Sequence, residues 1–431
     1  MRDYLVLMLV VATIPLALYS PFYGLLGFSW LAYMRPQDLA WGLAASLPLS
    51  KYVALALMAS MLLRGKVGIF RRGAVPFAML GLWLWLLVSC LNATYRDVAF
   101  EKLEDITKVL LIAFMTTVLL TDGKKFRVSV AVIALSLGFL GLKYGLYGIL
   151  RGGVHFTRGV GGMIGDNNDF ALALNMGLPL LVFTGLWIQS RWVRWAAFGL
   201  VPLSALTVVF THSRSGFLAL AATTLYLTFR SRRRALAIAA VVVMAAVGRL
   251  VVPASFYERV ASIGNYQDDS SAMGRLNAWS ASLHMANDYP IFGVGLDNFL
   301  FMFQDYAPDP DDIHVAHNTW LQVLAEAGYV GLLAYVALFL AAWGTMFSTE
   351  RLARRYRIRW AGDAARFLEA STLAFMVGGT FLNRAHFDLL YHVLILSFCL
   401  KRITLHEIAI QHQEVIAGGE TAPRATAWRA A

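Results

Sequence analysis

The feature that most constrains this chain is a succession of apolar runs, each about 15–25 residues long. A run of that length is about what an α-helix needs to cross the hydrocarbon core of a bilayer. Charged residues make up 15% of the 431 residues and hydrophobic residues 58%. Because roughly a quarter of the residues of a soluble globular protein are charged, the sequence predicts an all-α integral membrane protein rather than several soluble domains.

The predicted organisation is one polytopic domain over residues 1–431, with about twelve transmembrane helices. The stretch 21–47 contains Pro21 and Pro36 and is predicted to be a broken or interfacial hairpin, because a further crossing there would place the basic residues 64–72 outside. The tail 418–431 is rich in Ala, Gly and Arg and is predicted to be disordered. The spans are expected near residues 4–20, 48–63, 75–93, 106–120, 128–150, 170–189, 195–211, 216–230, 235–252, 318–346, 367–383 and 386–401.

The net charge of +11 is explained by membrane topology rather than by nucleic-acid binding. Clusters of Arg and Lys lie between the apolar runs, where the positive-inside rule expects cytoplasmic loops. With both termini cytoplasmic, 24 of the 37 Lys and Arg residues fall inside and 13 outside. The two cysteines, Cys90 and Cys399, lie within apolar runs, so the sequence predicts neither a disulfide framework nor a metal cluster.

Two outer loops are long, 151–169 and 253–317, and the second contains nine Asp and Glu residues but only two Arg. Within it, residues 274–287 have helical periodicity. That spacing predicts that Leu276, Trp279 or Ser280, Leu283 and Ala286 face the body of the protein.

Two arginines on the outer side are candidates for binding an anion. Arg214 lies in the short link THSRSG between two apolar runs, where an unpaired guanidinium is costly. It could bind an anionic substrate, reach lipid phosphates or pair with a loop carboxylate. Arg275, in SAMGRLNAW, could form a salt bridge with a loop acid or bind a diphosphate in a bidentate way. Together they could hold a pyrophosphate leaving group.

A polar stretch, HVAHNTWLQVLAEAG, precedes a long apolar run and begins at His314. A helix beginning near His317 would return Leu321, Leu324 and Gly328 to one face and turn Gln322 and Glu326 elsewhere. Asn318 or Thr319 could cap that helix. A neutral histidine at its mouth suits general-base chemistry, although a structural role is the alternative. His314 and His317 could share a helical face and hold a metal, but no third ligand is indicated, and we expect none.

Three sequence elements occur in the order of a known family. The pattern H-N-x-x-L-Q-x-L-A-E-x-G-x-x-G at 317–331 resembles the hallmark of the bacterial O-antigen ligase and polymerase superfamily. T-x-S-R-S-G at 211–216 and the G-R-x-x-x-W and P-x-x-G-x-G elements within 274–295 complete the resemblance. YMRPQD at 33–38 and GDNNDFALALNMGLPLL, from Gly165, resemble the O-glycosylation ligase branch.

The resemblance implies a multi-spanning glycosyltransferase of the GT-C type in the bacterial inner membrane, with 253–317 as its periplasmic loop. It implies transfer of a glycan from undecaprenyl diphosphate to lipid A-core, with no cofactor. His317 matches the catalytic histidine, and Arg214 and Arg275 match the arginines that contact the diphosphate. Polymerases and protein O-glycosyltransferases share these motifs and remain alternatives. Four further outer residues are expected to bind substrate: Arg35, Arg158, His314 and Arg384.

A secondary transporter is the main interpretation from another class, since about twelve spans suit one. Transporters, however, place their charges near the bilayer midplane on paired halves. Here no two halves of the sequence correspond, and the polar residues gather at one mouth. The sequence therefore favours an enzyme over a transporter.

Overall fold

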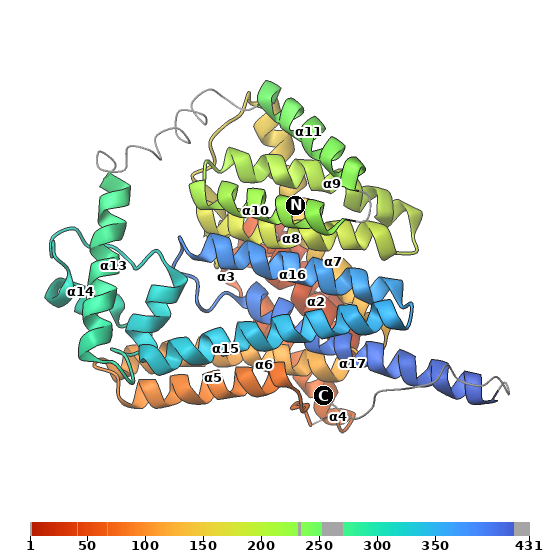
Figure 1. Ribbon diagram of the computed structural model, residues 1–431, viewed down its shortest axis with the longest axis horizontal. Coiled ribbons are helices and arrows are strands. Elements are labelled where there is room, and N and C mark those ends of the chain that lie inside the picture. The colour runs from red at the N-terminus through yellow and green to blue at the C-terminus, as the bar shows by residue number, and fades with distance from the viewer. Residues whose placement is uncertain (1, 41, 67, 232–233, 252–269, 418–431) are drawn as a thin grey trace.

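The computed structural model describes residues 2–40, 42–66, 68–231, 234–251 and 270–417. The fold is mostly helical, and the long helices run along the longest axis of the molecule (Figure 1). Each of the twelve predicted runs coincides with a helix. By length and composition, five described helices could cross a membrane, and two shorter ones are also apolar. The predicted tail 418–431 and the first residues of the predicted loop, 253–269, lie outside the described residues.

The N-terminal unit comprises five helices between residues 2 and 63. Its interior is formed mainly by Val10, Leu31 and Val53, which are fully or almost fully buried. The stretch 21–47 is helical but broken after Met34, as the prolines predicted. The unit contains α1 (Arg2–Tyr19), α2 (Pro21–Met34), the 3-10 helix η1 (Pro36–Leu39), α3 (Leu43–Ser46) and α4 (Leu49–Leu63).

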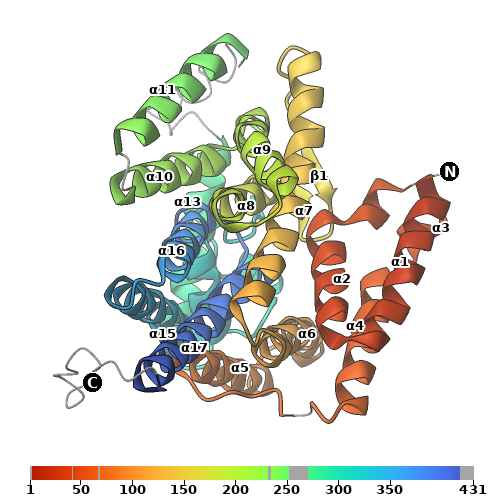
Figure 2. The ribbon, with the colours of Figure 1, turned by 90° about the vertical axis from the view of Figure 1, so that its right-hand side faces the viewer.

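The central bundle surrounds α8, most of whose residues are buried. Helices α7 and α9 pack on one side of α8, and α10 and α16 on another. In an end-on view, α10 and α11 lie on the opposite side of the molecule from α1, α2 and α4 (Figure 2). The described helices of the bundle are α5 (Ala74–Leu91), α6 (Arg96–Leu119), α7 (Gly123–Leu150), α8 (Asn167–Trp187), α9 (Arg191–Phe210), α10 (Arg214–Arg230), α11 (Arg234–Val251), α15 (Thr319–Arg355), α16 (Arg359–Gly379) and α17 (Asp388–Ala417).

The two ends of this bundle are named here after residues of α15. The His317 end is where α15 begins, and the Glu350 end is where α15 finishes and α16 starts. At the His317 end, a two-stranded antiparallel hairpin joins β1 (Arg158–Gly161) to β2 (Ile164–Asp166) and leads directly into α8. Helices α13 (Ser270–Asp288) and α14 (Phe299–Tyr306) also stand at this end (Figure 1).

The segment from Pro290 to Gly295 crosses over α15 and joins it by backbone hydrogen bonds. Val294 N donates to Ala325 O at 2.9 Å, and Tyr329 N donates to Pro290 O at 2.8 Å. Gly328 has a φ of +71°, so α15 is kinked there, and a Cβ at Gly328 would collide with the backbone of Ile291. The glycines of the P-x-x-G-x-G and A-E-x-G elements therefore allow two backbones to approach closely.

The helix predicted at 274–287 is present as part of α13, but the predicted buried face is mostly wrong. Leu276 and Leu283 are exposed, whereas Ala278, Ala281 and Met285 are fully buried. The small side chains face inward because they let α13 pack closely against its neighbours, a preference that hydrophobic periodicity alone does not reveal.

Candidate active site

His317 lies in the extended segment that leads into α15. The side chain of Asn318 caps the helix, accepting hydrogen bonds from the backbone N–H groups of Trp320 and Leu321 at 3.0 and 3.2 Å. The φ of His317 is +44°, in the left-handed region that residues other than glycine rarely adopt. Such conformations cluster at functional sites. The predicted cap at Asn318 is confirmed.

Two details predicted for this stretch are wrong. Because α15 begins at Thr319, His314 and His317 precede the helix and share no helical face. Gln322 and Glu326, predicted to turn away from the buried face, are themselves buried. Gln322 Oε1 accepts a hydrogen bond from Ala385 N at 3.2 Å. Such a partner allows a polar side chain to be buried, and the polarity of the side chain alone did not reveal it.

The α16–α17 connection is fixed beside His317 by the first turn of α15. Thr319 Oγ1 donates to Leu382 O at 2.9 Å and accepts from Arg384 N at 3.2 Å. Ala385 O accepts from the hydroxyls of both Tyr335 and Tyr391. These contacts hold the backbone of Arg384 at a defined position relative to His317.

The guanidinium of Arg384 forms a bidentate pair with Asp169 on α8. Arg384 Nε donates to Asp169 Oδ1 at 2.6 Å, and Arg384 Nη2 donates to Oδ2. The Asp169 side chain is 4% exposed and that of Arg384 is 33% exposed. The neighbouring Asp166 caps α8, with its side chain accepting a hydrogen bond from Asn168 N. The role of Asp169 depends on a contact across 215 positions, which no local pattern signals.

Several charged side chains surround His317. Burial lowers the pKa of His317 to about 4, and the neighbouring Arg275 and His314 act in the same direction. Asp166 acts in the opposite direction, and Arg384 makes a further lowering contribution. His317 is therefore neutral at pH 7, and the imidazole keeps a lone pair that can accept a proton.

Arg275 is on α13, which rests on the segment that leads to His317. Trp279 Nε1 donates to Ala316 O at 3.0 Å, and Asn277 Nδ2 donates to Asp309 O at 2.8 Å. His314 Nε2 lies 2.8 Å from Asp312 Oδ1 in the same segment. The two predicted elements around Arg275 and His317, far apart in sequence, are thus brought together.

Arg214 is the first residue of α10. Ser213 caps this helix, with its Oγ accepting from Gly216 N at 3.0 Å, and His212 has a φ of +51°. Asn167 Nδ2 donates to Thr211 O at 2.9 Å, which ties this turn to the start of α8. Arg214 therefore stands at the positive end of a helix dipole, a favourable place for an anion.

The other predicted substrate-binding arginines lie near the hairpin. Arg35 has a φ of +50° and pairs with Asp38. Gly162, in the turn of the hairpin, lies directly against the Arg35 guanidinium. Arg158 is exposed on β1. Within the residues that the structure describes, no three His, Cys, Asp or Glu side chains are arranged to hold a metal ion.

Comparison with known families identifies the middle of the chain. A family model described as O-antigen ligase matches residues 199–336, which include Arg214, Arg275 and His317. Over these residues the chain matches the O-antigen ligase family. A second model, described as a family of unknown function (DUF5935), matches residues 1–171. No curated protein matches the chain.

This match to the O-antigen ligase family supports a transferase in the general sense. It implies a lipid-linked glycan donor and a lipid acceptor. Together with the apolar helices, it indicates a multi-pass membrane protein. Arg384 and all of α16 and α17 lie beyond both matched segments, so the structure adds residues that the family models do not cover.

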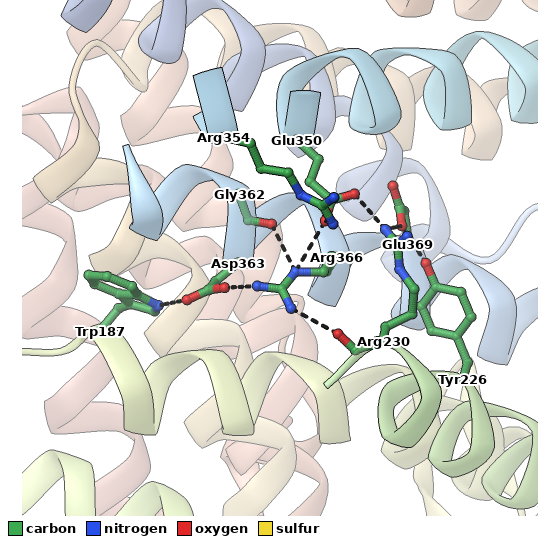
Figure 3. A network of polar contacts seen from close by, with 9 residues as sticks. All are labelled: Trp187, Tyr226, Arg230, Glu350, Arg354, Gly362, Asp363, Arg366 and Glu369. Carbon is green, nitrogen blue, oxygen red and sulfur yellow. Dashed lines mark hydrogen bonds and ion pairs between the residues drawn. The ribbon is translucent and has the colours of Figure 1, made fainter. Parts of the chain in front are cut away.

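The Glu350 end of the bundle contains a charged network that the sequence analysis did not single out (Figure 3). The buried carboxylate of Glu350 contacts Arg230 at 2.5 Å, Arg354 at 2.7 Å and Arg366 at 3.3 Å. Glu369, also buried, accepts hydrogen bonds from Tyr226 and Arg230. The possible signal was the presence of acids within or beside apolar runs, where charges are rare.

An apolar cavity of about 740 Å³ extends along α10 and ends at this network. Its walls come from α8, α9, α10, α11 and α16, and its polar end contains Arg230, Asp363 and Arg366. On α10 it extends from Leu220 to Arg230. The cavity therefore begins less than two turns along the helix from Arg214.

Proposed function

We propose that this protein is an O-antigen ligase with twelve transmembrane helices, of the GT-C type, in the bacterial inner membrane. It transfers a glycan from undecaprenyl diphosphate to a hydroxyl of lipid A-core at the periplasmic face, and both termini are cytoplasmic. The observation that carries the proposal is His317: a neutral, strained histidine beside Arg275 and Arg384 at one end of a membrane bundle.

The reaction we propose is a single displacement with inversion. His317 accepts the proton of the acceptor hydroxyl while the hydroxyl oxygen bonds to the anomeric carbon of the donor sugar. The bond between that carbon and the diphosphate oxygen breaks, and the electron pair leaves with the diphosphate. Arg214 and Arg275 stabilise the charge that develops on the leaving group. The reaction consumes no nucleotide, since the diphosphate linkage of the donor is itself the activated bond.

Donor binding and the basicity of His317 are coupled in this scheme. A pKa of about 4 keeps the imidazole neutral but makes it a weak base. Burial is the main cause, and the positive charge of Arg275 is the next. A diphosphate bound to Arg275 offsets that charge, so the pKa of His317 rises when the donor is in place. The base is then strongest in the complex that reacts.

The cavity along α10 suits the carrier lipid of the donor. A diphosphate at Arg214 would leave its polyprenyl chain beside the helix that lines the cavity, and the walls there are mainly aliphatic and aromatic. His314, Arg158 and the partly exposed guanidinium groups of Arg35 and Arg384 complete the proposed substrate-binding residues.

The test is transfer by the purified protein. It is supplied with undecaprenyl diphosphate-linked glycan and lipid A-core, with EDTA and without nucleotide, and the products are analysed by mass spectrometry. Lipid A-core that gains the glycan supports the proposal. Lengthening of the donor glycan, with unmodified lipid A-core, would instead make the protein a polymerase. If neither product forms with verified substrates, ligase activity is rejected and donor transport in proteoliposomes is measured.

A further inference from the structure

A second lateral cavity, of about 510 Å³, lies between the N-terminal unit and the bundle. Its walls come from α2, α4, α6 and α17 and include Phe28, Ala54, Met58 and Ile112. Ligand-binding pockets commonly have volumes of about 300–1,000 Å³ and mainly apolar walls. It is separate from the cavity along α10: α10 and α11, which line that cavity, stand on the opposite side of the molecule from α2 and α4, which line this one (Figure 2).

The polar groups of this N-terminal cavity indicate a ligand with a polar head. Tyr33 OH lies 2.9 Å from His392 Nδ1, and both side chains are at least 95% buried. His392 Nε2 is buried and has no hydrogen-bond partner among the described residues. Burying a polar atom without a partner is unfavourable, because the atom loses its hydrogen bond to water. A ligand hydroxyl, ester or amide in the cavity would supply the missing hydrogen bond.

The mouth of the cavity provides a positive charge. Lys51, near the start of α4, is exposed and makes no ion pair with another described residue. Lys108, in contrast, is paired with Glu104 at 2.9 Å and Asp105 at 3.0 Å. Lys51 is therefore the side chain at this mouth that remains available for an anionic head group.

The polar end of the cavity adjoins the candidate active site. Asp388 lines the cavity at the first turn of α17, four positions after Arg384. Tyr33 and Asp388 also line a small crevice together with Arg35 and Met163 of the hairpin turn. A lipid in the cavity would thus place its head group at the His317 end and its chains between α4 and α6.

We infer that the N-terminal cavity binds the acceptor, an acylated and phosphorylated glycolipid, by its acyl chains and a head-group phosphate. This inference rests on the proposed function, in which the donor lipid occupies the cavity along α10. Lys51 and His392 act as binding residues. It assigns a role to the segment that matches the family of unknown function: to bring the second lipid substrate to the site from the other side of the bundle.

The test compares an acylated with a deacylated acceptor. Ala54→Trp places an indole in the cavity. Leu62→Trp is the matched control, because Leu62 lies on the same helix and is 65% exposed. We expect Ala54→Trp to raise the KM for lipid A-core about tenfold, equivalent to about 1.4 kcal/mol. The KM for the donor and the transfer to deacylated core oligosaccharide should stay unchanged, as they should for Leu62→Trp. Lys51→Gln should weaken use of phosphorylated but not of dephosphorylated lipid A-core.

Other outcomes overturn the inference. A raised donor KM would assign the cavity to the carrier lipid, and equal effects on both acceptors would mean that Ala54→Trp disturbs the active site. A binding measurement keeps the inference separate from the transferase reaction: lipid A-core is titrated into His317→Ala protein with and without Ala54→Trp. Weaker binding with Ala54→Trp supports the cavity even if no transfer occurs. Equal displacement of lipid A-core by phosphatidylglycerol would make it a general lipid site.

Discussion

The two ends of the bundle contain similar charged residues but organise them differently. At the Glu350 end, two buried carboxylates are surrounded by arginines, so that the charges offset one another within the protein (Figure 3). At the His317 end, Arg275 and Arg384 lie near a neutral imidazole whose backbone is strained. A balanced network mainly ties helices together. The Arg384–Asp169 pair at the His317 end is balanced too, but together with Arg275 it lies beside a neutral imidazole, an arrangement suited to an anionic substrate.

The largest expected effect comes from removing the base. His317→Ala should lower the rate of transfer by about 10²–10⁴-fold, the usual contribution of a general base, without changing membrane insertion. His412→Ala is the matched control, because His412 contacts Ile408 O on α17 and lies far along that helix from Arg384. Initial rates with purified proteins measure both. Transfer at the wild-type rate by His317→Ala would remove the general-base proposal.

The next effect concerns stability and belongs to the other end. Glu350→Gln removes a carboxylate shared by three arginines and should lower the free energy of unfolding by roughly 3 kcal/mol, at the low end for a broken buried ion pair. The loss of stability is limited because Arg230 still forms an ion pair with Glu369, and Arg366 still forms one with Asp363. Transfer per folded molecule should not change. Thermal unfolding in detergent measures the effect, with the exposed Glu101→Gln as control; equal stability of the two variants would show that the network is not stabilising.

A smaller loss of activity is expected when a lysine replaces one arginine, which keeps the positive charge but not the planar guanidinium. Arg275→Lys should reduce kcat/KM about tenfold, since an ammonium cannot donate to a diphosphate in a bidentate way. Arg354→Lys is the control at the Glu350 end: the Arg354 side chain is 61% exposed and pairs with Glu350 in the preceding turn of α15. Activity assays at saturating acceptor distinguish them. If the two variants behave alike, the fork geometry at Arg275 is irrelevant.

The helix cap next to His317 should contribute less again. Asn318→Ala leaves the N–H groups of Trp320 and Leu321 without their acceptor and should cost about 1 kcal/mol of stability. Asn318→Ser, which retains a capping oxygen, should recover most of it. Thermal unfolding of the three proteins is compared. No difference between Ala and Ser would mean that water satisfies these groups equally well.

The smallest effect appears only in acid. Because protonated His317 cannot act as a base, kcat/KM should fall as the pH drops through its pKa of about 4. Burial is the main cause of that low pKa, and the positive charge of Arg275 is the next. Arg275→Gln removes that charge and should therefore move the fall of kcat/KM in acid, its acid limb, to higher pH, whereas Arg275→Lys keeps the charge and should not. Near pH 7, the activity of the wild type, Arg275→Gln and Arg275→Lys should be insensitive to small pH changes. A limb that stays in place in Arg275→Gln would contradict the electrostatic coupling.

Much of the architecture was predictable because bilayer crossing and helix capping are local requirements. The apolar runs coincide with helices, Asn318 caps α15, and the proline-rich stretch 21–47 is broken as expected. The buried face of α13 was not predictable, since Ala278 and Ala281 are chosen by close packing and not by hydrophobicity.

The candidate site itself shows the division between sequence and tertiary structure. The sequence by itself determined which side chains are candidates for the chemistry, Arg214, Arg275 and His317, since their types and motifs are local. Only the tertiary structure decided that Asp169 pairs with Arg384, that Gln322 is buried against Ala385, and that a cavity forms against the N-terminal unit. These features join residues far apart in the chain, and a pairing across such a distance is set by how the helices pack, which no spacing along the sequence encodes.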